Sequence, residues 1–179
     1  GTRARKTRTK SFNAFSSIDY PETAMFRDRR LIQFLQRPAE YTHAVFSTAL
    51  DPNVFVLRLV PGMRADIIPM LEGRYRALVL ESFGVGGLPG GDDGAMFAAV
   101  RDWCGAGHLA VFTTQVPHEG SDLAVYEVGR AAKALPGVLE AHDMTPEATA
   151  VKLMWVLGQT TDRAEAEKLF QTPVQWDIL

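Results

Sequence analysis

The chain lacks several features that would assign it to a specialised class of protein. It has one cysteine among 179 residues, Cys104, so no internal disulfide can form and no pair of thiolates is available for a metal ion. No apolar run approaches the roughly 18–20 residues of a transmembrane helix. A net charge of −2 gives no reason to expect nucleic acid or an anionic membrane as a partner. We expect no metal site, because His108, His118 and His142 lack metal-ligand spacing, and we expect no cofactor.

What remains is the composition of an ordinary globular protein, with 46% hydrophobic and 22% charged residues. The length suffices for one domain of ordinary size, or for one domain plus part of another. Cys104 lies in a run of helical spacing, residues 96–106. We expect it to be a packed core thiol, because free cysteines are among the most buried residue types.

From Pro52 onward, apolar runs typical of strands alternate with helical patterns. This alternation predicts an α/β fold with an open parallel sheet that helices cover on both faces. The expected strands span residues 54–60, 75–81, 108–113 and a short stretch near 138–139, and the expected helices span 64–71, 93–105, 123–134, 145–157 and 162–170.

Particular residues mark where these helices begin and end. Asp93 is a plausible N-cap, and Thr145 is another, with Pro146 at the first helical position, where a missing N–H costs nothing. Pro69 should kink or shorten the helix at 64–71. Gly158 is expected to end the helix that Thr145 begins.

The stretch from Val79 to Pro89 is the most informative part of the chain. An apolar strand reaches a polar residue and then breaks into a loop with Gly84, Gly86 and Gly87. In a doubly wound sheet, the carboxyl ends of the strands open into ligand-facing loops of this kind. Glycine lets such a backbone approach a ligand or a partner closely, although turn geometry alone would also explain these residues.

Several motifs follow this loop in an order and at a spacing that resemble one family. They are Thr113-Thr114-Gln115, Tyr126-Glu127-Val128-Gly129-Arg130, the segment 142–148 and the segment 151–158. Together they resemble the carboxyl-terminal domain of a type I (cytosolic) L-asparaginase. That resemblance implies a Rossmann-like carboxyl-terminal domain, preceded by the tail of a catalytic domain.

The resemblance extends over essentially the whole chain. Residues 1–15 and the following Ser16-Ser17-Ile18-Asp19-Tyr20-Pro21 resemble the end of the family's catalytic domain. We therefore expect residues 1–51 to be the end of that domain plus a linker, and residues 52–179 to be the carboxyl-terminal α/β domain. Lys6, nine residues before Phe15, falls on the family's catalytic lysine. Read without the resemblance, Lys6 is one charge of a solvated basic tail.

The chemistry explains why a lysine belongs at that place in the family. A threonine hydroxyl is a weak nucleophile near neutral pH and needs a base to accept its proton. A lysine removed from water can have its pKa lowered enough for this work. The family's threonine motifs, Gly-Gly-Thr-Ile and Gly-Thr-Asp-Thr, do not occur here, so this polypeptide alone lacks the nucleophile. We expect it to be inactive without an amino-terminal catalytic portion.

Two further site predictions come from the resemblance. Glu119 lies in a loop that, in family members, extends toward a neighbouring subunit's substrate pocket. Gly86 and Gly87 belong to another loop, which the resemblance places near such a neighbouring site. The chain also departs from the family at three places. Arg5 replaces a common threonine, Gly87 replaces a common asparagine, and Glu81 replaces the arginine of some allosterically regulated members.

The resemblance implies that the whole protein is a cytoplasmic amidohydrolase of L-asparagine, and possible action on glutamine follows from the same family. Its expected partners are the amino-terminal asparaginase portion and further copies of itself, as a dimer or tetramer. Two alternatives stay open at this point. One is the asparaginase-like subunit of a tRNA-dependent amidotransferase, and the other is a non-catalytic α/β binding module.

Overall fold

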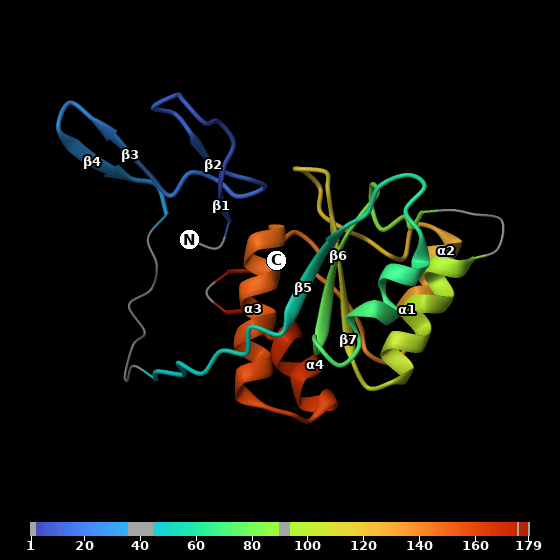
Figure 1. Ribbon diagram of the computed structural model, residues 1–179. Coiled ribbons are helices and arrows are strands. Elements are labelled where there is room, and N and C mark those ends of the chain that lie inside the picture. The colour runs from blue at the N-terminus through green and yellow to red at the C-terminus, as the bar shows by residue number, and fades with distance from the viewer. Residues whose placement is uncertain (1–2, 36–44, 90–93, 175, 179) are drawn as a thin grey trace.

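The predicted parallel sheet is present in the computed structural model, which describes residues 3–35, 45–89, 94–174 and 176–178. Its four strands lie side by side in chain order, and every neighbouring pair is parallel. The prediction of an α/β fold with a parallel sheet between residues 54 and 140 is therefore confirmed (Figure 1). The strands are β5 (Val54–Arg58), β6 (Ala77–Ser82), β7 (Leu109–Thr114) and β8 (Val138–Glu140).

Helices cover both faces of this sheet, as Figure 1 shows. Because strand side chains alternate between faces, the buried strand β6 supplies Val79 to one core and Leu80 to the other. This two-sided burial explains why the strands read as continuous apolar runs. One face carries α3 (Pro146–Gln159) and α4 (Arg163–Gln171), and the other carries α1 (Ala95–Gly105), α2 (Glu127–Lys133) and the short 3-10 helices η1 (Ala65–Ile67) and η2 (Pro69–Leu71).

Two of the expected helices are shorter than the sequence pattern suggests. The pattern at 64–71 becomes η1 and η2, and Pro69 opens the second of them because it has no N–H to continue the first. The helix expected from residue 123 begins only at Glu127, because Tyr126 has extended backbone angles, and the Leu123 N–H before it donates to the Glu140 carboxylate. Asp93, the expected N-cap of α1, lies outside the described residues.

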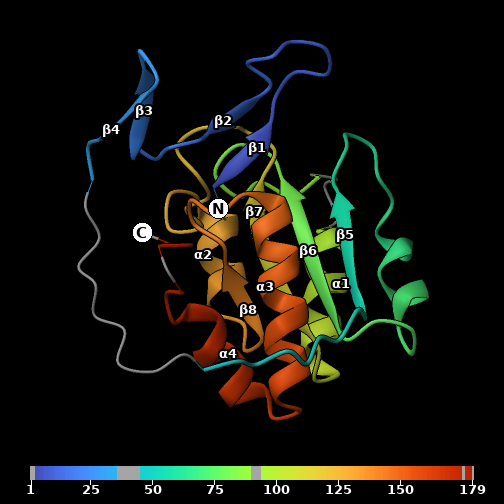
Figure 2. The same ribbon diagram turned by 90° about the vertical axis from the view of Figure 1, so that its left-hand side faces the viewer.

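The amino-terminal segment forms two antiparallel hairpins. β1 (Ala4–Lys6) pairs with β2 (Phe15–Ser17), and β3 (Ala24–Arg27) pairs with β4 (Arg30–Gln33). Figure 2 shows both hairpins beyond the carboxyl ends of the sheet strands, with β1 above β7 and α3. The division into residues 1–51 and 52–179 stays a prediction.

The end of the amino-terminal segment crosses the far end of α3 (Figure 2). The Trp155 indole donates to the Ser47 carbonyl at 3.2 Å, and the Gln159 amide donates to the Ala49 carbonyl at 2.8 Å. The sequence predicted that Gly158 would end α3, but the helix continues to Gln159. Gly158 instead leaves room for the segment that crosses α3, because a Cβ at this position would lie 2.4 Å from the Ala49 carbonyl oxygen.

Candidate functional site

Loops from three neighbouring strands meet at the carboxyl edge of the sheet. After β6, the chain turns tightly, and the N–H groups of Gly86 and Gly87 both donate to the Phe83 carbonyl at 3.0 and 2.7 Å. This turn is tied to the loop after β7, because the Asp122 N–H donates to the Val85 carbonyl at 2.7 Å and the Thr114 hydroxyl donates to Gly84. The loop 82–89 therefore lies at the strand ends, as the sequence predicted, and is fastened to its neighbour.

The glycines of this loop have a local structural role. Gly86 has a φ of +149°, and a Cβ there would lie 2.5 Å from the Leu123 side chain. A Cβ on Gly87 would lie 3.3 Å from the Phe83 carbonyl oxygen, inside the turn itself. Backbone conformation and packing against Leu123 account for Gly86, and turn geometry accounts for Gly87, while their proximity to a neighbouring subunit's site stays a prediction.

The Thr113-Thr114-Gln115 motif ends β7 and stabilises the strand edge. The Gln115 amide nitrogen donates to the carbonyl oxygens of Leu59 and Glu81 at 2.6 and 2.8 Å, which bridges the ends of β5 and β6. The Ser82 hydroxyl donates to the Thr113 carbonyl at 2.7 Å. These bonds satisfy backbone groups that the ladder leaves open at its end.

Glu81 stands beside Arg58 on the neighbouring strand, at the same register position. An arginine Nη1 lies 3.5 Å from the Glu81 Oε2, which is an ion-pair distance but not a hydrogen bond. Glu81, one of the three residues at which the chain departs from the family, thus has Arg58 as its ion-pair partner.

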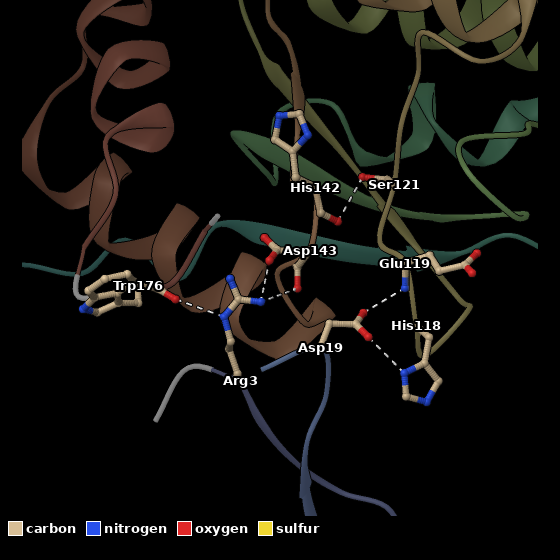
Figure 3. A network of polar contacts seen from close by, with 8 residues as sticks. All are labelled: Arg3, Asp19, His118, Glu119, Ser121, His142, Asp143 and Trp176. Carbon is tan, nitrogen blue, oxygen red and sulfur yellow. Dashed lines mark hydrogen bonds and ion pairs between the residues drawn. The ribbon is translucent and has the colours of Figure 1, made fainter. Parts of the chain in front are cut away.

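The loop after β7 is held by Asp19, which lies between the two amino-terminal hairpins, as Figure 3 shows. Asp19 accepts a hydrogen bond from the Glu119 backbone N–H at 2.8 Å through Oδ2. Its other carboxylate oxygen, Oδ1, lies 3.0 Å from Nδ1 of His118. From the opposite side, the Ser121 N–H donates to the His142 carbonyl at 2.8 Å. The Glu119 backbone is therefore fixed at this edge, while its side chain is exposed.

Two arginines dock the β1–β2 hairpin onto the start of α3. Arg3 is buried and lies 2.5 Å from the Asp143 carboxylate, and its Nε donates to the Trp176 carbonyl at 3.0 Å (Figure 3). Arg5 pairs with Glu147 at 3.1 Å. Asp143 and Glu147 flank the start of α3, where carboxylates favour the helix dipole, and each also anchors an arginine.

Lys6 is the residue of β1 directly after Arg5, and neighbouring strand residues point to opposite faces. Arg5 faces α3, so Lys6 points away from it. Lys6 is exposed, and its ammonium group has no hydrogen-bond or ion-pair partner within the described residues. The structure thus places Lys6 on an anchored hairpin, and its catalytic role stays a prediction.

The single thiol does not belong to this site. Cys104 is buried in α1, and burial raises the pKa of its thiol to about 12. The prediction of a packed core thiol is confirmed. In the described ranges, no group of three or more His, Cys, Asp or Glu side chains could hold a metal ion. Over the same residues, no helix is long and apolar enough to cross a membrane.

Asp19 and Arg3 are residues of this region to which the sequence gave no role, and Arg5 was noted only as a departure from the family. The contact between Asp19 and Glu119 joins residues 100 positions apart, and sequence spacing carries no signal for such a pair. Arg3 and Arg5 were visible as part of a basic run, which is more often solvated than buried.

Comparison with known proteins identifies the family. The glutaminase/asparaginase C-terminal domain family matches residues 53–170. An L-asparaginase of Thermococcus kodakarensis is 37% identical over 99% of this chain and 53% of its own length. One subunit of the glutamyl-tRNA(Gln) amidotransferase of Metallosphaera sedula is 32% identical over 96% of this chain and 39% of its own length.

The solved structures agree with this result. The thermostable L-asparaginase from Thermococcus kodakarensis matches with a TM-score of 0.91 at 35% identity, over 99% of this chain and 53% of that one. The chain thus spans about half the length of the asparaginase that it matches, and less of the amidotransferase protein. The family resemblance read from the motifs is confirmed, and the chain belongs to the glutaminase/asparaginase family, whose C-terminal domain it contains.

Proposed function

We propose that this chain is the carboxyl-terminal part of an amidohydrolase that converts L-asparagine to L-aspartate and ammonia. The observation that carries this proposal is the extent of the structural match. It covers 99% of the chain, so it includes the hairpins before residue 53 as well as the C-terminal domain. The nucleophile would be a threonine upstream of this chain, because the family's threonine motifs are absent from the sequence.

Lys6 is the proposed catalytic residue of this portion. Its hairpin is fixed by the ion pairs of Arg3 and Arg5, so the lysine is presented from an anchored segment. The ammonium group is exposed in this chain. A covering catalytic portion would exclude water from it, and a desolvated lysine is suited to accept a proton from a threonine hydroxyl.

Glu119, Gly86 and Gly87 form the proposed substrate-facing edge. Asparagine carries an ammonium group, and a carboxylate such as that of Glu119 is its natural partner. The fixed backbone and exposed side chain of Glu119 suit contact with a substrate held by another subunit. The two glycines would let the neighbouring loop approach the same place closely. Glutamine, which is one methylene longer, is a second candidate substrate.

The proposed partners are the amino-terminal catalytic portion and further copies of the protein, in a closed dimer or tetramer. Several large apolar side chains of the hairpin segment are exposed and support this, since apolar side chains that gather on a surface mark contact sites. The exposed side chains are Phe12, Phe15, Phe26, Leu31 and Phe34. The proposal also includes a cytoplasmic location for the whole protein.

The test is ammonia release from L-asparagine by rigorously purified 1–179 protein, alone and with the amino-terminal asparaginase portion supplied as a separate or fused chain. We expect no release from the chain alone, because the nucleophile is absent, and release from the assembled protein. A catalytic portion whose nucleophilic threonine is replaced by alanine is the matched control. Activity of the chain alone, or an inactive assembly that is folded, would refute the proposal.

A second candidate function is that of a tRNA-dependent amidotransferase, which the similarity to the Metallosphaera sedula protein favours. Such a protein would release ammonia from an amide donor, and a partner chain would help to transfer it to the glutamyl group carried by a tRNA. Asparagine hydrolysis that needs only the amino-terminal asparaginase portion, and neither tRNA nor a further chain, decides for the first proposal, and a strict need for both decides for the second.

A further inference from the structure

The loop that follows β7 holds Glu119 in a backbone conformation that glutamate does not prefer. Glu119 has a φ of +74° and Gly120 a φ of +71°, both in the left-handed region. Glycine accepts this region freely, whereas glutamate does so at a cost. A Cβ on Gly120 would lie 2.5 Å from the His142 carbonyl oxygen, so the loop is pressed against the end of β8. Such a conformation persists only where surrounding contacts determine it.

Asp19 supplies the contact on the open side of this loop (Figure 3). Its carboxylate accepts the Glu119 N–H at 2.8 Å and lies 3.0 Å from the His118 ring nitrogen. A hydrogen bond from a backbone N–H to a carboxylate is charge-assisted and stronger than a neutral one. Asp19 itself has a φ of +53°, so both ends of the contact are held in the left-handed region.

The contact with Asp19 fixes the backbone of Glu119 and does not involve its side chain. Within the described residues, the Glu119 carboxylate has no hydrogen-bond or ion-pair partner, and Figure 3 shows it pointing away from Asp19. Asp19 stands two residues after β2, which pairs with the β1 strand that carries Lys6. The same carboxylate therefore links the hairpin of Lys6 to the loop of Glu119.

We propose that Asp19 is a positioning residue of this amidohydrolase, which holds the Glu119 backbone so that its carboxylate is presented to substrate. This inference rests on the function proposed above and adds a residue to its site. Asp19 touches no reacting atom and acts through Glu119 alone. Removing it should free the loop and misplace the carboxylate, with the threonine and Lys6 left in place.

The experiment is a double-mutant cycle in the assembled enzyme, with steady-state kinetics on L-asparagine. We expect Asp19→Ala to raise KM roughly tenfold while kcat stays within about threefold, because a substrate contact is lost and the chemistry is not. In a Glu119→Ala background, Asp19→Ala should have almost no further effect, since the two act as a unit. Asp19→Asn keeps one oxygen for the Glu119 N–H and should restore most of the affinity.

Asp66→Ala is the matched control, because it removes an exposed carboxylate that pairs with Arg64 far from this loop, and it should change neither constant. If Asp19→Ala does not fold, Asp19→Ser replaces it in the cycle. Effects of Asp19 and Glu119 that multiply in the double variant overturn the inference, as does an unchanged KM. An assembled parent that releases no ammonia overturns the proposed function instead, so the two failures are distinguishable.

Discussion

At the scale of single residues, Arg5 and Lys6 show how neighbours in one short strand can have different roles. Arg5 forms an ion pair with Glu147, whereas Lys6 is exposed and unpaired within the described residues. A basic tail free in solution would not divide its charges in this way, since each would point to water. The anchored hairpin supports the interpretation of Lys6 as a site residue.

In the assembled enzyme, we expect Lys6→Ala to leave folding and substrate binding largely intact and to lower kcat. A general base typically contributes about 10²–10⁴-fold, so a loss of that order is the expected result. Lys6→Arg should not rescue activity, because a guanidinium stays protonated and cannot accept a proton. Lys10→Ala, another exposed lysine of the same hairpin, is the matched control. An alanine variant that keeps more than about half of the parent kcat would make Lys6 an ordinary surface charge.

Cys104 illustrates the opposite case, because its surroundings make a potentially reactive thiol unreactive. Burial raises the pKa of its thiol to about 12, so almost no thiolate is present at pH 8. We expect iodoacetamide to leave Cys104 unmodified in the folded protein and to modify it fully in urea, as measured by mass spectrometry of its peptide. Rapid modification of the folded protein would contradict the packed position in α1.

At the scale of elements, the sheet was predictable and several helix ends were not. β6 and β7 are buried on both faces and form unbroken apolar runs, so they could be read within a few residues, and the apolar edge strand β5 could be read equally well. The end of α3 could not, because a glycine near a helix end normally signals a stop. Gly158 is instead selected by the Ala49 backbone, which comes from a distant part of the chain. Asp19 was missed for the same reason, since its partner Glu119 is remote in sequence.

Gly158 gives a prediction at this scale. Alanine is usually the better helix residue by about 0.5–1 kcal/mol, yet Gly158→Ala should destabilise the protein by about 1–3 kcal/mol. The reason is that its Cβ would lie 2.4 Å from a backbone oxygen, which cannot move aside as a side-chain end can. Urea unfolding of the protein measures this change.

The control for that experiment is Gly105→Ala, at the last residue of α1. A Cβ there meets nothing within 4 Å, so the ordinary preference for alanine should give a neutral or slightly stabilised protein. Equal effects of the two substitutions would show that the crossing segment does not restrict residue 158.

At the scale of the whole molecule, the segment that crosses α3, residues 47–51, is held by an ion pair as well as by hydrogen bonds. Asp51 lies 2.8 Å from Arg76 at the start of β6, and Arg76 also donates to the Leu157 carbonyl at 3.1 Å. The Asp51 N–H donates to the Met154 carbonyl at 2.9 Å. The Asp51–Arg76 ion pair therefore joins the amino-terminal segment to the start of β6 and, through the Leu157 carbonyl, to α3.

This ion pair predicts how stability depends on pH. Burial raises the pKa of Asp51, but the hydrogen bonds from Arg76 and Asn53 and the charge of Arg76 outweigh it, so the pKa is lowered overall. A carboxyl whose pKa is lower in the folded state stabilises that state above its unfolded pKa of about 3.9. The contribution is lost as the pH falls through the folded-state value. Asp51→Asn should thus cost about 1–2 kcal/mol at pH 7, and the difference from the parent should shrink as the pH falls below about 4.

Urea unfolding of both proteins between pH 7 and pH 2.5 checks this expectation. Asp102→Asn is the control, because its carboxylate is exposed beside Arg101 and should contribute little at any pH. A gap between parent and Asp51→Asn that stays constant down to pH 2.5 would mean that packing, and not the carboxylate charge, holds the crossing segment. A gap that closes with acid means that the charge of the Asp51 carboxylate helps to hold residues 47–51 on the domain, in addition to the ion pairs that Arg3 and Arg5 form at the start of α3.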